Sequence, residues 1–303
     1  SRPGELFHLL NILDPRSWPN WYEYARRFCA AKQTRWGFDT SGASNVEELH
    51  NKVRGYFLRR KKDEILTELP PRIFVDIPVT LDDNIQKQYN TAEKDLVRYL
   101  KNIGRVDREI AKTLAAEKLT RLNVLRMLCS SGKVAAAKEL IENIIDGDEK
   151  VIVYASFVGP LETLKKHFGD KAVIITGQTP IADRQSAVKR FQADVGVQVF
   201  LGGYKSAATG ITLTKAKTFI GIDYPFNPSD LAQSIDRMHR IGQTANSVNV
   251  FQLVAHGTID DDMKILLAKK QDLFDKIIDG KVSPGKEKKM IDIVVDGILK
   301  KYN

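Results

Sequence analysis

The chain has 303 residues, 43% of them hydrophobic and 28% charged, which allows about two folded domains and excludes a disordered chain. The formal net charge of +9 favours a polyanionic partner. The sequence contains no apolar run near the ~20 residues of a membrane helix, no signal-peptide pattern, and no metal-ligand spacing among its two cysteines and five histidines. We therefore expect no membrane partner, no metal site, and an intracellular location: the nucleus in a eukaryote, the cytoplasm in a prokaryote or a virus.

The first part of the chain predicts short helices around an apolar core. Residues at helical spacing predict helices over 6–13 and 17–29, the second with an aromatic stripe that we expect to be buried. Asn45 is a candidate N-cap for the next helix, with Glu48 in the capping-box position. Residues 72–79 alternate as a strand does, and the proline among them favours the edge of a sheet.

The middle of the chain predicts two long, charged helices over 82–100 and 111–128. A Ser-Ser-Gly-Lys run that ends at Lys133 invites interpretation as a phosphate-binding loop. However, no glycine precedes Gly132 by five residues, and Val134 stands where that loop needs Ser or Thr. We interpret the run as the start of a helix.

From residue 133 onward the pattern changes to alternating helices and strands. Short apolar runs predict buried strands at 150–155, 173–176, 197–201, 218–223 and 248–254. The segments between them have helical spacing, and Thr258 with Asp261 resembles a capping box for a long helix after the last strand. Strands joined by crossover helices predict an open, doubly wound parallel sheet, whose ligands lie at the carboxyl ends of the strands.

The segment 233–243 reads Gln-Ser-Ile-Asp-Arg-Met-His-Arg-Ile-Gly-Gln. On a helix, Gln233, Arg237 and Arg240 would share one face. Two neighbouring guanidinium groups suit the spread charge of a phosphoryl group in transfer; the alternative is a solvated basic helix end. The string resembles motif VI of the Swi/Snf-type branch of superfamily-two helicases. The resemblance implies that Gln233, Arg237 and Arg240 are catalytic and that Asp236 belongs to the nucleotide site, although Asp236 could instead pair within the lobe.

Further segments carry the same resemblance. Residues 57–70, Phe-Leu-Arg-Arg-Lys-Lys-Asp-Glu-Ile-Leu-Thr-Glu-Leu-Pro, resemble a block of this family, and the loop 36–45 resembles its annealing-helicase (Harp-like) branch. The two charged helices resemble the helical protrusion between the family's two lobes. The segments 151–157, 177–192 and 202–213 resemble motif IV, a G-x-T block with a following Arg and Phe, and motif V.

Motif V is rich in small residues, which let backbone amides approach a phosphate closely. The resemblance implies that Gly210 contacts the nucleotide. It also implies DNA contacts by six residues: Ser156, Arg184, Lys205, Ser206, Ala207 and Thr209. Ala208 and Thr212, like Thr209, depart from the family's pattern, which leaves open the side chain that touches DNA. In the later Asp-Tyr-Pro-Phe-Asn-Pro run, Phe226 replaces the family's Trp, and both a buried turn and a direct ligand contact are open interpretations.

The expected fold class is α/β, with a RecA-like doubly wound parallel sheet (the second helicase lobe) preceded by a mainly helical region. We expect four segments: the remainder of a first RecA-like lobe and the start of a helical insertion (1–75), the helical protrusion (76–132), the second RecA-like lobe (133–280) and a C-terminal tail (281–303). No G-x-x-x-x-G-K-[ST] loop and no Asp-Glu-x-His strand occurs in the sequence. We therefore expect ATP and Mg²⁺ to be bound mainly by a first lobe that this chain lacks.

The resemblance implies the C-terminal motor lobe of an ATP-dependent double-stranded DNA translocase, of the fork-remodelling or annealing-helicase type. Its partners would be double-stranded or forked DNA and the N-terminal RecA-like lobe of the same protein, and the chain by itself would be inactive. Two alternatives stay open. One is a non-catalytic DNA-binding or regulatory module with a RecA-like lobe; the other is an interaction scaffold built on the helices of residues 82–128.

Overall fold

The computed structural model of the chain describes residues 3–34, 37–40, 42–58, 62–103, 111–207, 210–279 and 290–302. The chain divides into two compact units. One unit consists of Ser1–Ile65 and Ile265–Asp296, and the other consists of Leu66–Lys264 and Gly297–Asn303. Two helices, α11 (Ile259–Asp279) and α12 (Met290–Lys300), contribute residues to both units.

The N-terminal unit packs its helices around an aromatic core. Its elements are α1 (Pro3–Leu13), α2 (Trp21–Phe28), the antiparallel strands β1 (Lys32–Thr34) and β2 (Gly37–Asp39), α3 (Val46–Val53) and α4 (Lys62–Ile65). Phe7, Trp18, Tyr24 and Phe28 are buried, with ring centroids between 5.1 and 6.1 Å apart where they contact one another. The burial predicted for the aromatic stripe of residues 17–29 is confirmed for Trp18, Tyr24 and Phe28, and it is wrong for Tyr22, which is 62% exposed.

Two asparagines precede helices in this unit, and only one of them caps its helix. α2 begins at Trp21, later than predicted, because the Asn20 Oδ1 accepts a hydrogen bond of 2.8 Å from the backbone N–H two residues on. Asn45 has a φ of 47° and makes no side-chain cap. Its Nδ2 donates to the Arg27 carbonyl at 2.7 Å, and Glu48 pairs with the Arg27 side chain at 2.7 Å. The predicted capping box is wrong, because contacts to α2 occupy both of its side chains.

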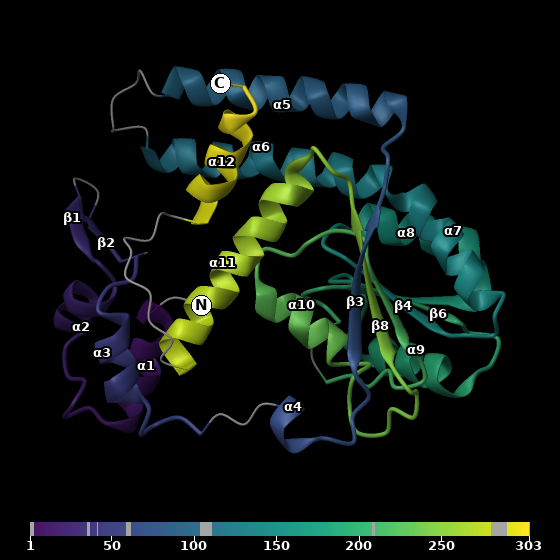
Figure 1. Cartoon of the computed structure of the whole chain (residues 1–303), viewed down its shortest axis with the longest axis horizontal. Coiled ribbons are helices and arrows are strands. Elements are labelled where there is room, and N and C mark those ends of the chain that lie inside the picture. Colours follow the sequence, from purple (N-terminus) through teal and green to yellow (C-terminus); the bar gives the residue numbers. More distant parts are fainter. Residues whose placement is uncertain are drawn as a thin grey trace. The chain divides into compact units, whose positions relative to one another are not determined.

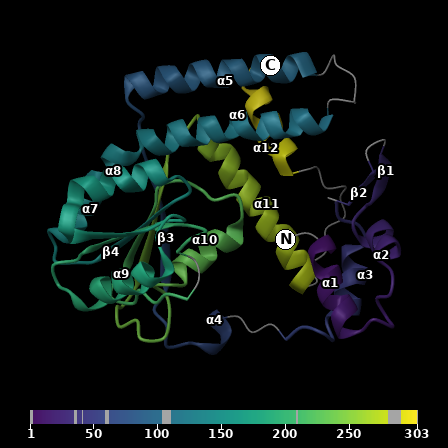
Figure 2. The ribbon, with the colours of Figure 1, turned by 180° about the vertical axis from the view of Figure 1, so that it is seen from behind.

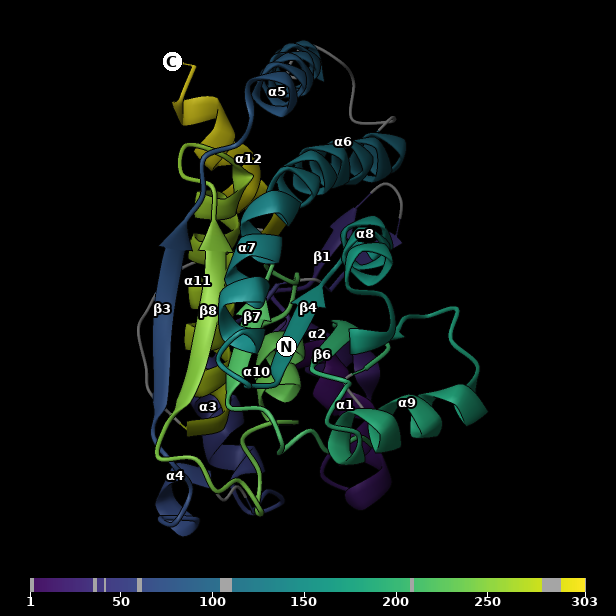
Figure 3. The same ribbon diagram turned by 90° about the vertical axis from the view of Figure 1, so that its right-hand side faces the viewer.

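The second unit contains a six-stranded sheet in the order β3-β8-β7-β4-β6-β5, and every adjacent pair of strands is parallel. The strands are β3 (Arg72–Pro78), β4 (Val151–Ala155), β5 (Ala172–Ile175), β6 (Val199–Gly203), β7 (Thr218–Gly221) and β8 (Val248–Val254). β3 lies at the edge beside β8, as its proline predicted (Figure 3). The predicted fold class is confirmed. The predicted segment boundary at residue 75 falls inside β3, while the division into four segments stays a prediction.

Helices cover both faces of the sheet. Side chains alternate along each strand, so every strand contributes side chains to both faces. The helices are α7 (Val134–Ile145), α8 (Val158–Phe168), the short 3₁₀ helix η2 (Gly169–Lys171), α9 (Ile181–Ala193) and α10 (Pro228–Ile235). The odd-numbered residues of β4 share a core with α7 and α8, and the even-numbered residues share a core with α9 and α10 (Figure 1). All five residues of β4 are buried, so the strand lies inside the core and only its carboxyl end reaches a surface.

The predicted pair of long helices is present as α5 (Asp83–Ile103) and α6 (Ala111–Gly132), which lie side by side (Figure 1, Figure 2). α5 begins after Asp82, whose Oδ1 accepts hydrogen bonds from the N–H groups of Asn84 and Ile85 at 3.0 and 2.9 Å. α5 extends to Ile103, beyond its predicted end at residue 100, and residues 104–110 lie outside the described part of the chain. Among the described residues, no helix is both long enough and apolar enough to cross a bilayer.

Candidate functional site

The candidate site lies at the carboxyl ends of the parallel strands, where doubly wound sheets bind their ligands. Asp223 follows β7 and is only 2% exposed. Its carboxylate accepts hydrogen bonds from the Ser156 N–H at 2.9 and 3.1 Å and from the Ser130 Oγ at 2.7 Å. These bonds join the end of β7 to the end of β4 and to α6. Ser156 itself is exposed, and the DNA contact predicted for it stays a prediction.

The turn after β6, which corresponds to motif V, is built from small residues around one buried tyrosine. The Tyr204 hydroxyl donates to the Asp223 carbonyl at 2.8 Å. A Cβ atom on Gly202 would lie 3.0 Å from the buried ring of Tyr154, so this position needs glycine. Gly210, the predicted nucleotide contact, has a φ of +73° and is exposed. A residue in this conformation turns the chain sharply and leaves its backbone accessible.

Several of the predicted DNA contacts lie in this turn. Lys205 is exposed and Ser206 is half-buried. Ala207 is 1% exposed; its N–H donates to a carbonyl earlier in the turn at 2.9 Å, and its carbonyl accepts from the Tyr154 hydroxyl at 3.0 Å. Ala207 therefore shapes the turn, and a direct DNA contact by this residue has no structural support, because a methyl in the core presents nothing to a ligand. Thr209 lies outside the described residues.

Arg184, on α9, connects two loops of the site. Its Nε donates to the Thr179 carbonyl at 3.0 Å, and its Nη2 donates to the Thr176 carbonyl at 3.3 Å, both after β5. Its Nη1 donates to the Ser206 carbonyl at 3.3 Å. A planar guanidinium reaches three carbonyls in this way because its donors point outward as a fork. The DNA contact predicted for Arg184 stays a prediction, and the structure adds a role in holding the loops together.

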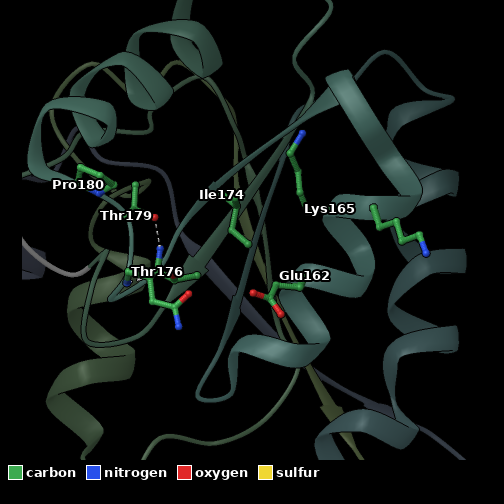
Figure 4. Close-up of a pocket in the computed structure, with 8 residues that line it drawn as sticks. Glu162, Lys165, Ile174, Thr176, Thr179 and Pro180 are labelled. Atoms are coloured by element: carbon green, nitrogen blue, oxygen red, sulfur yellow. Dashed lines mark hydrogen bonds between the residues drawn. The ribbon is translucent and has the colours of Figure 1, made fainter.

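A pocket of about 460 Å³ opens beside the end of β5. Figure 4 shows Glu162 and Lys165 of α8 on one side, and Thr176 and Thr179 of the loop after β5 on the other. The loop keeps its shape because the Thr176 N–H donates to the Thr179 Oγ1 at 2.9 Å. The lining residues are Glu162, Lys165, Lys166, Ile174, Thr176, Gln178, Thr179 and Pro180.

The motif VI arginines do not lie on a helix. α10 ends at Ile235, and Arg237 and Arg240 follow in turns, so the predicted single helical face is wrong. In a longer helix the Arg237 carbonyl would accept a hydrogen bond from the N–H four residues later. Here it accepts from the Leu213 N–H at 2.8 Å. A bond to motif V has thus replaced the next helical bond.

The side chains of motif VI differ in how they are engaged. Arg240 is exposed, and its Nη1 donates to the Thr212 Oγ1 at 3.3 Å. Arg237 is half-buried, and among the described residues its buried Nε has no hydrogen-bond partner. Gln233 is exposed on α10, and Asp236 is half-buried where that helix ends. A guanidinium with an unpaired donor, next to a loop with small residues, fits a phosphate group.

Metal ligands are a different matter. Within the described ranges, no group of three or more His, Cys, Asp or Glu side chains is arranged to hold a metal ion. Mg²⁺ usually keeps several waters and takes one or two carboxylates together with substrate phosphates.

The sequence analysis missed Arg126, a residue of α6 that is 5% exposed. Its Nη2 donates to the Tyr224 carbonyl at 2.6 Å and to the Ser156 Oγ at 3.2 Å. Its guanidinium carbon lies 4.0 Å from the centroid of the Phe226 ring. Burial lowers the pKa of Arg126, and the nearby carboxylate of Asp223 opposes this shift. Since an arginine stays protonated in proteins, the site contains a buried positive charge.

The predicted helix start at Lys133 is confirmed, because Lys133 immediately precedes α7, but the burial of its side chain was missed. It is fully buried between α6 and α7, and its Nζ lies 2.7 Å from the Asp260 Oδ2 and 3.1 Å from the Leu253 carbonyl. The Ser-Ser-Gly-Lys run contains the last residues of α6 and the residue before α7. Its lysine pairs with Asp260 and so links this junction to α11. A signal for both residues was present, because Arg126, Ser130 and Lys133 lie at helical spacing on one face.

Comparisons with known proteins place these features in context. Residues 2–134 match the SNF2-related domain, and residues 132–242 match the helicase conserved C-terminal domain. The chain is 29% identical over 292 residues to the mouse (Mus musculus) "DNA annealing helicase and endonuclease ZRANB3", covering 92% of this chain and 26% of that protein. It is 31% identical over 281 residues to "SWI/SNF-related matrix-associated actin-dependent regulator of chromatin subfamily A-like protein 1" of Xenopus laevis, covering 89% of this chain and 28% of that protein.

A solved structure shows the same fold. The Sulfolobus solfataricus SWI2/SNF2 ATPase core in complex with dsDNA is 25% identical, with a TM-score of 0.56, and the match covers 89% of this chain and 58% of that one. The chain spans little more than a quarter of the length of each of the two curated relatives named above.

Proposed function

Because the chain belongs to the Swi/Snf-type helicase-like family, in its Harp-like branch, we propose that it forms the C-terminal motor lobe of an ATP-dependent double-stranded DNA translocase. The biological task would be fork remodelling or strand annealing. The chain matches the SNF2-related domain and the helicase conserved C-terminal domain. Members of this family couple ATP hydrolysis to movement along DNA. The name of the mouse relative, an annealing helicase, supports the choice of task.

One observation carries the proposal: motif V and motif VI contact each other directly. The Leu213 N–H donates to the Arg237 carbonyl at 2.8 Å, and the Arg240 side chain reaches the Thr212 Oγ1 at 3.3 Å. A nucleotide that touches motif V would therefore lie close to two guanidinium groups. Arg237 and Arg240 are the proposed arginine fingers, which stabilise the charge that develops on the transferred phosphoryl group. Gln233 and Asp236 are proposed to orient them.

The proposed ligands follow from the chemistry of these residues. ATP supplies the phosphoryl group, and Mg²⁺ belongs mainly to an N-terminal RecA-like lobe of the same protein, which is a proposed partner. Double-stranded or forked DNA is the other proposed partner. Its backbone would meet the exposed side chains of Lys205 and Ser156 at the carboxyl edge of the sheet, and the net charge of +9 supports a polyanion. A nuclear location in a eukaryote, or a cytoplasmic one otherwise, stays a prediction.

The test compares the intact protein with this chain alone in a steady-state ATPase assay titrated with double-stranded DNA. We expect DNA-stimulated turnover from the intact protein and none from the chain alone, because the sequence lacks a phosphate loop and the Mg²⁺ carboxylates. An intact protein that binds DNA without turnover would instead be the non-catalytic DNA-binding or regulatory module. Turnover by the chain alone would contradict the proposed division between two lobes.

A further inference from the structure

α6 presents a row of polar side chains to the carboxyl edge of the sheet. Arg126, Cys129, Ser130 and Lys133 are each at most 5% exposed. Besides the bonds of Ser130 and Lys133 already described, the Cys129 Sγ lies 3.3 Å from a threonine hydroxyl, that of Thr258. Burying polar and charged groups is unfavourable unless each finds a partner. This face of α6 is therefore matched to the ends of particular strands.

Arg126 has the most extensive contacts in this row. Its guanidinium carbon lies 4.0 Å from the centroid of the Phe226 ring and 5.3 Å from that of Phe157, so it stacks against side chains from two loops. It also donates hydrogen bonds to both loops, at the Tyr224 carbonyl and the Ser156 Oγ. One side chain of the helical protrusion thus connects the loop after β4 with the loop after β7.

We propose that Arg126 is a positioning residue, which holds the loops after β4 and β7 in the arrangement that DNA requires. The proposal rests on the function proposed above. Through Arg126, the helix pair α5–α6 is tied to the edge of the sheet that carries Ser156. Arg126 touches neither the nucleotide nor the reacting atoms in this proposal, and it acts through the two loops.

The chemistry of the contact supports positioning rather than simple packing. Well-packed apolar side chains often replace buried charges at no loss of stability. The same helix already buries Leu122 and Leu125, so an apolar side chain is accommodated readily on this element. What an apolar residue lacks is the planar fork, which fixes the direction of two hydrogen bonds and presents a flat face to an aromatic ring.

α6 also offers a matched control. Arg121 lies on the same helix, its Nη2 is 2.8 Å from the Glu117 Oε1, and its guanidinium carbon is 4.4 Å from the centroid of the Tyr99 ring. Its contacts are of the same kinds as those of Arg126. They remain within the α5–α6 pair, so replacing Arg121 removes similar interactions without touching either loop.

The first arm of the experiment measures ATPase activity of the intact protein against DNA concentration for Arg126→Met, Arg126→Lys and Arg121→Met. We expect Arg126→Met to raise the DNA concentration for half-maximal stimulation by about tenfold, the size expected for lost charged hydrogen bonds, with the KM for ATP unchanged. Arg126→Lys should recover part of this loss, because it retains the charge but not the fork. Arg121→Met should stay within about twofold of the wild type.

The second arm needs no activity and uses hydrogen exchange on this chain. Arg126→Met should speed amide exchange in residues 155–158 and 223–227 by about tenfold and leave β5 unchanged, because only the two loops lose their connection. Wild-type DNA dependence together with wild-type exchange in Arg126→Met would overturn the proposal. An equal effect in Arg121→Met, or a uniform rise of exchange over the sheet, would also overturn it, since either indicates general destabilisation.

The two arms separate the failure of this inference from the failure of the proposed function. If DNA does not stimulate the wild-type intact protein, the proposed function is wrong, and the exchange measurement alone decides whether Arg126 positions the loops. If DNA stimulates the wild type and both Arg126 variants equally, the proposed function stands and the role of Arg126 is wrong.

Discussion

Two regions at the carboxyl edge of the sheet differ in how their polar groups are satisfied. Around Asp223, the carboxylate accepts three hydrogen bonds and Arg126 donates to both neighbouring loops. Around motif VI, Arg240 makes one bond of 3.3 Å, and the Arg237 Nε has no partner among the described residues. An unpaired buried donor costs about 1–3 kcal/mol, which a structure tolerates where a ligand will use the group. The polar groups around Asp223 are paired within the chain, whereas motif VI leaves the Arg237 Nε unpaired among the described residues.

The largest effect is expected for substitutions in motif VI, the region with the unpaired donor. Arg237→Ala or Arg240→Ala should lower turnover of the intact protein by about 10³–10⁵, the range for arginine fingers. The free energy of unfolding should change by no more than about 0.5 kcal/mol in Arg240→Ala, because that side chain is exposed, and it should not fall in Arg237→Ala, which removes an unpaired buried donor. Lysine at either position should rescue poorly, since a point charge does not reproduce the fork. A steady-state ATPase titration with DNA measures the effect.

A binding isotherm for the same variants provides the control. DNA affinity should survive both substitutions, and Arg98→Ala, which removes an exposed arginine of α5, should leave turnover unchanged. Normal turnover at saturating DNA with weakened DNA binding would instead mean that the motif VI arginines form a basic patch.

The next largest effect is expected around Asp223, where the polar groups are already paired by hydrogen bonds. Asp223→Ala should lower the free energy of unfolding by about 3 kcal/mol, because it leaves the Ser130 Oγ and the Ser156 N–H without their acceptor and removes the carboxylate near the buried charge of Arg126. Urea unfolding of this chain measures the loss. Asp170→Ala, at an exposed aspartate of η2, is the control and should change the value by less than about 0.5 kcal/mol. Equal losses would remove the contrast between the two regions.

A third prediction asks whether an unsatisfied buried group away from the ligand edge only costs stability. Among the described residues, the Asp262 Oδ2 accepts no hydrogen bond, and the Lys301 Nζ lies 3.8 Å away. Burial raises the pKa of Asp262 to about 6; Lys301 opposes this, and Asp261 and Glu93 add to it. The folded state therefore holds this proton more tightly than the unfolded chain. The contribution of Asp262 to stability is greatest below pH 3.8 and is lost as the pH rises to about 6.

Asp262→Asn removes this dependence. At pH 7 the substitution should raise the free energy of unfolding by about 1–3 kcal/mol, and between pH 4 and pH 6 it should flatten the slope of stability against pH. Urea unfolding at a series of pH values tests both effects. A variant that is less stable than the wild type at pH 7 would show that the carboxylate has a stabilising partner after all.

The smallest effect concerns DNA contact at the exposed edge. Binding should be weak, indifferent to sequence and salt-dependent, and Lys205→Ala should reduce the slope of log affinity against log salt by about 0.9 if it contacts one phosphate. Lys171→Ala is the matched control, because Lys171 precedes β5 at the opposite, amino edge of the sheet and is also exposed. A sequence-specific footprint, or an unchanged slope in Lys205→Ala, would contradict this contact.

The sequence by itself predicted the fold class, which the structure confirms, and a phosphate-binding role for motif VI, which stays a prediction. Buried parallel strands are short apolar runs separated by helical spacing, and both signals are local. The proline of β3 likewise predicted an edge position, because a residue without an N–H is poorly suited to the interior of a sheet. The role proposed for Arg237 and Arg240 rests on residue type, because guanidinium groups suit a phosphoryl group, and the Arg237 Nε, unpaired among the described residues, supports it.

The tertiary structure decided which groups meet. The Arg237 carbonyl accepts from the Leu213 N–H instead of a later helical N–H, and Asn45 has a φ of 47° and donates its amide to the Arg27 carbonyl without capping α3. Arg126 reaches the loop after β7 across 98 positions of sequence. Each of these contacts joins residues that are distant in sequence. Local sequence pattern does not describe hydrogen-bond partners that are distant in sequence, so these contacts are known only from the tertiary structure.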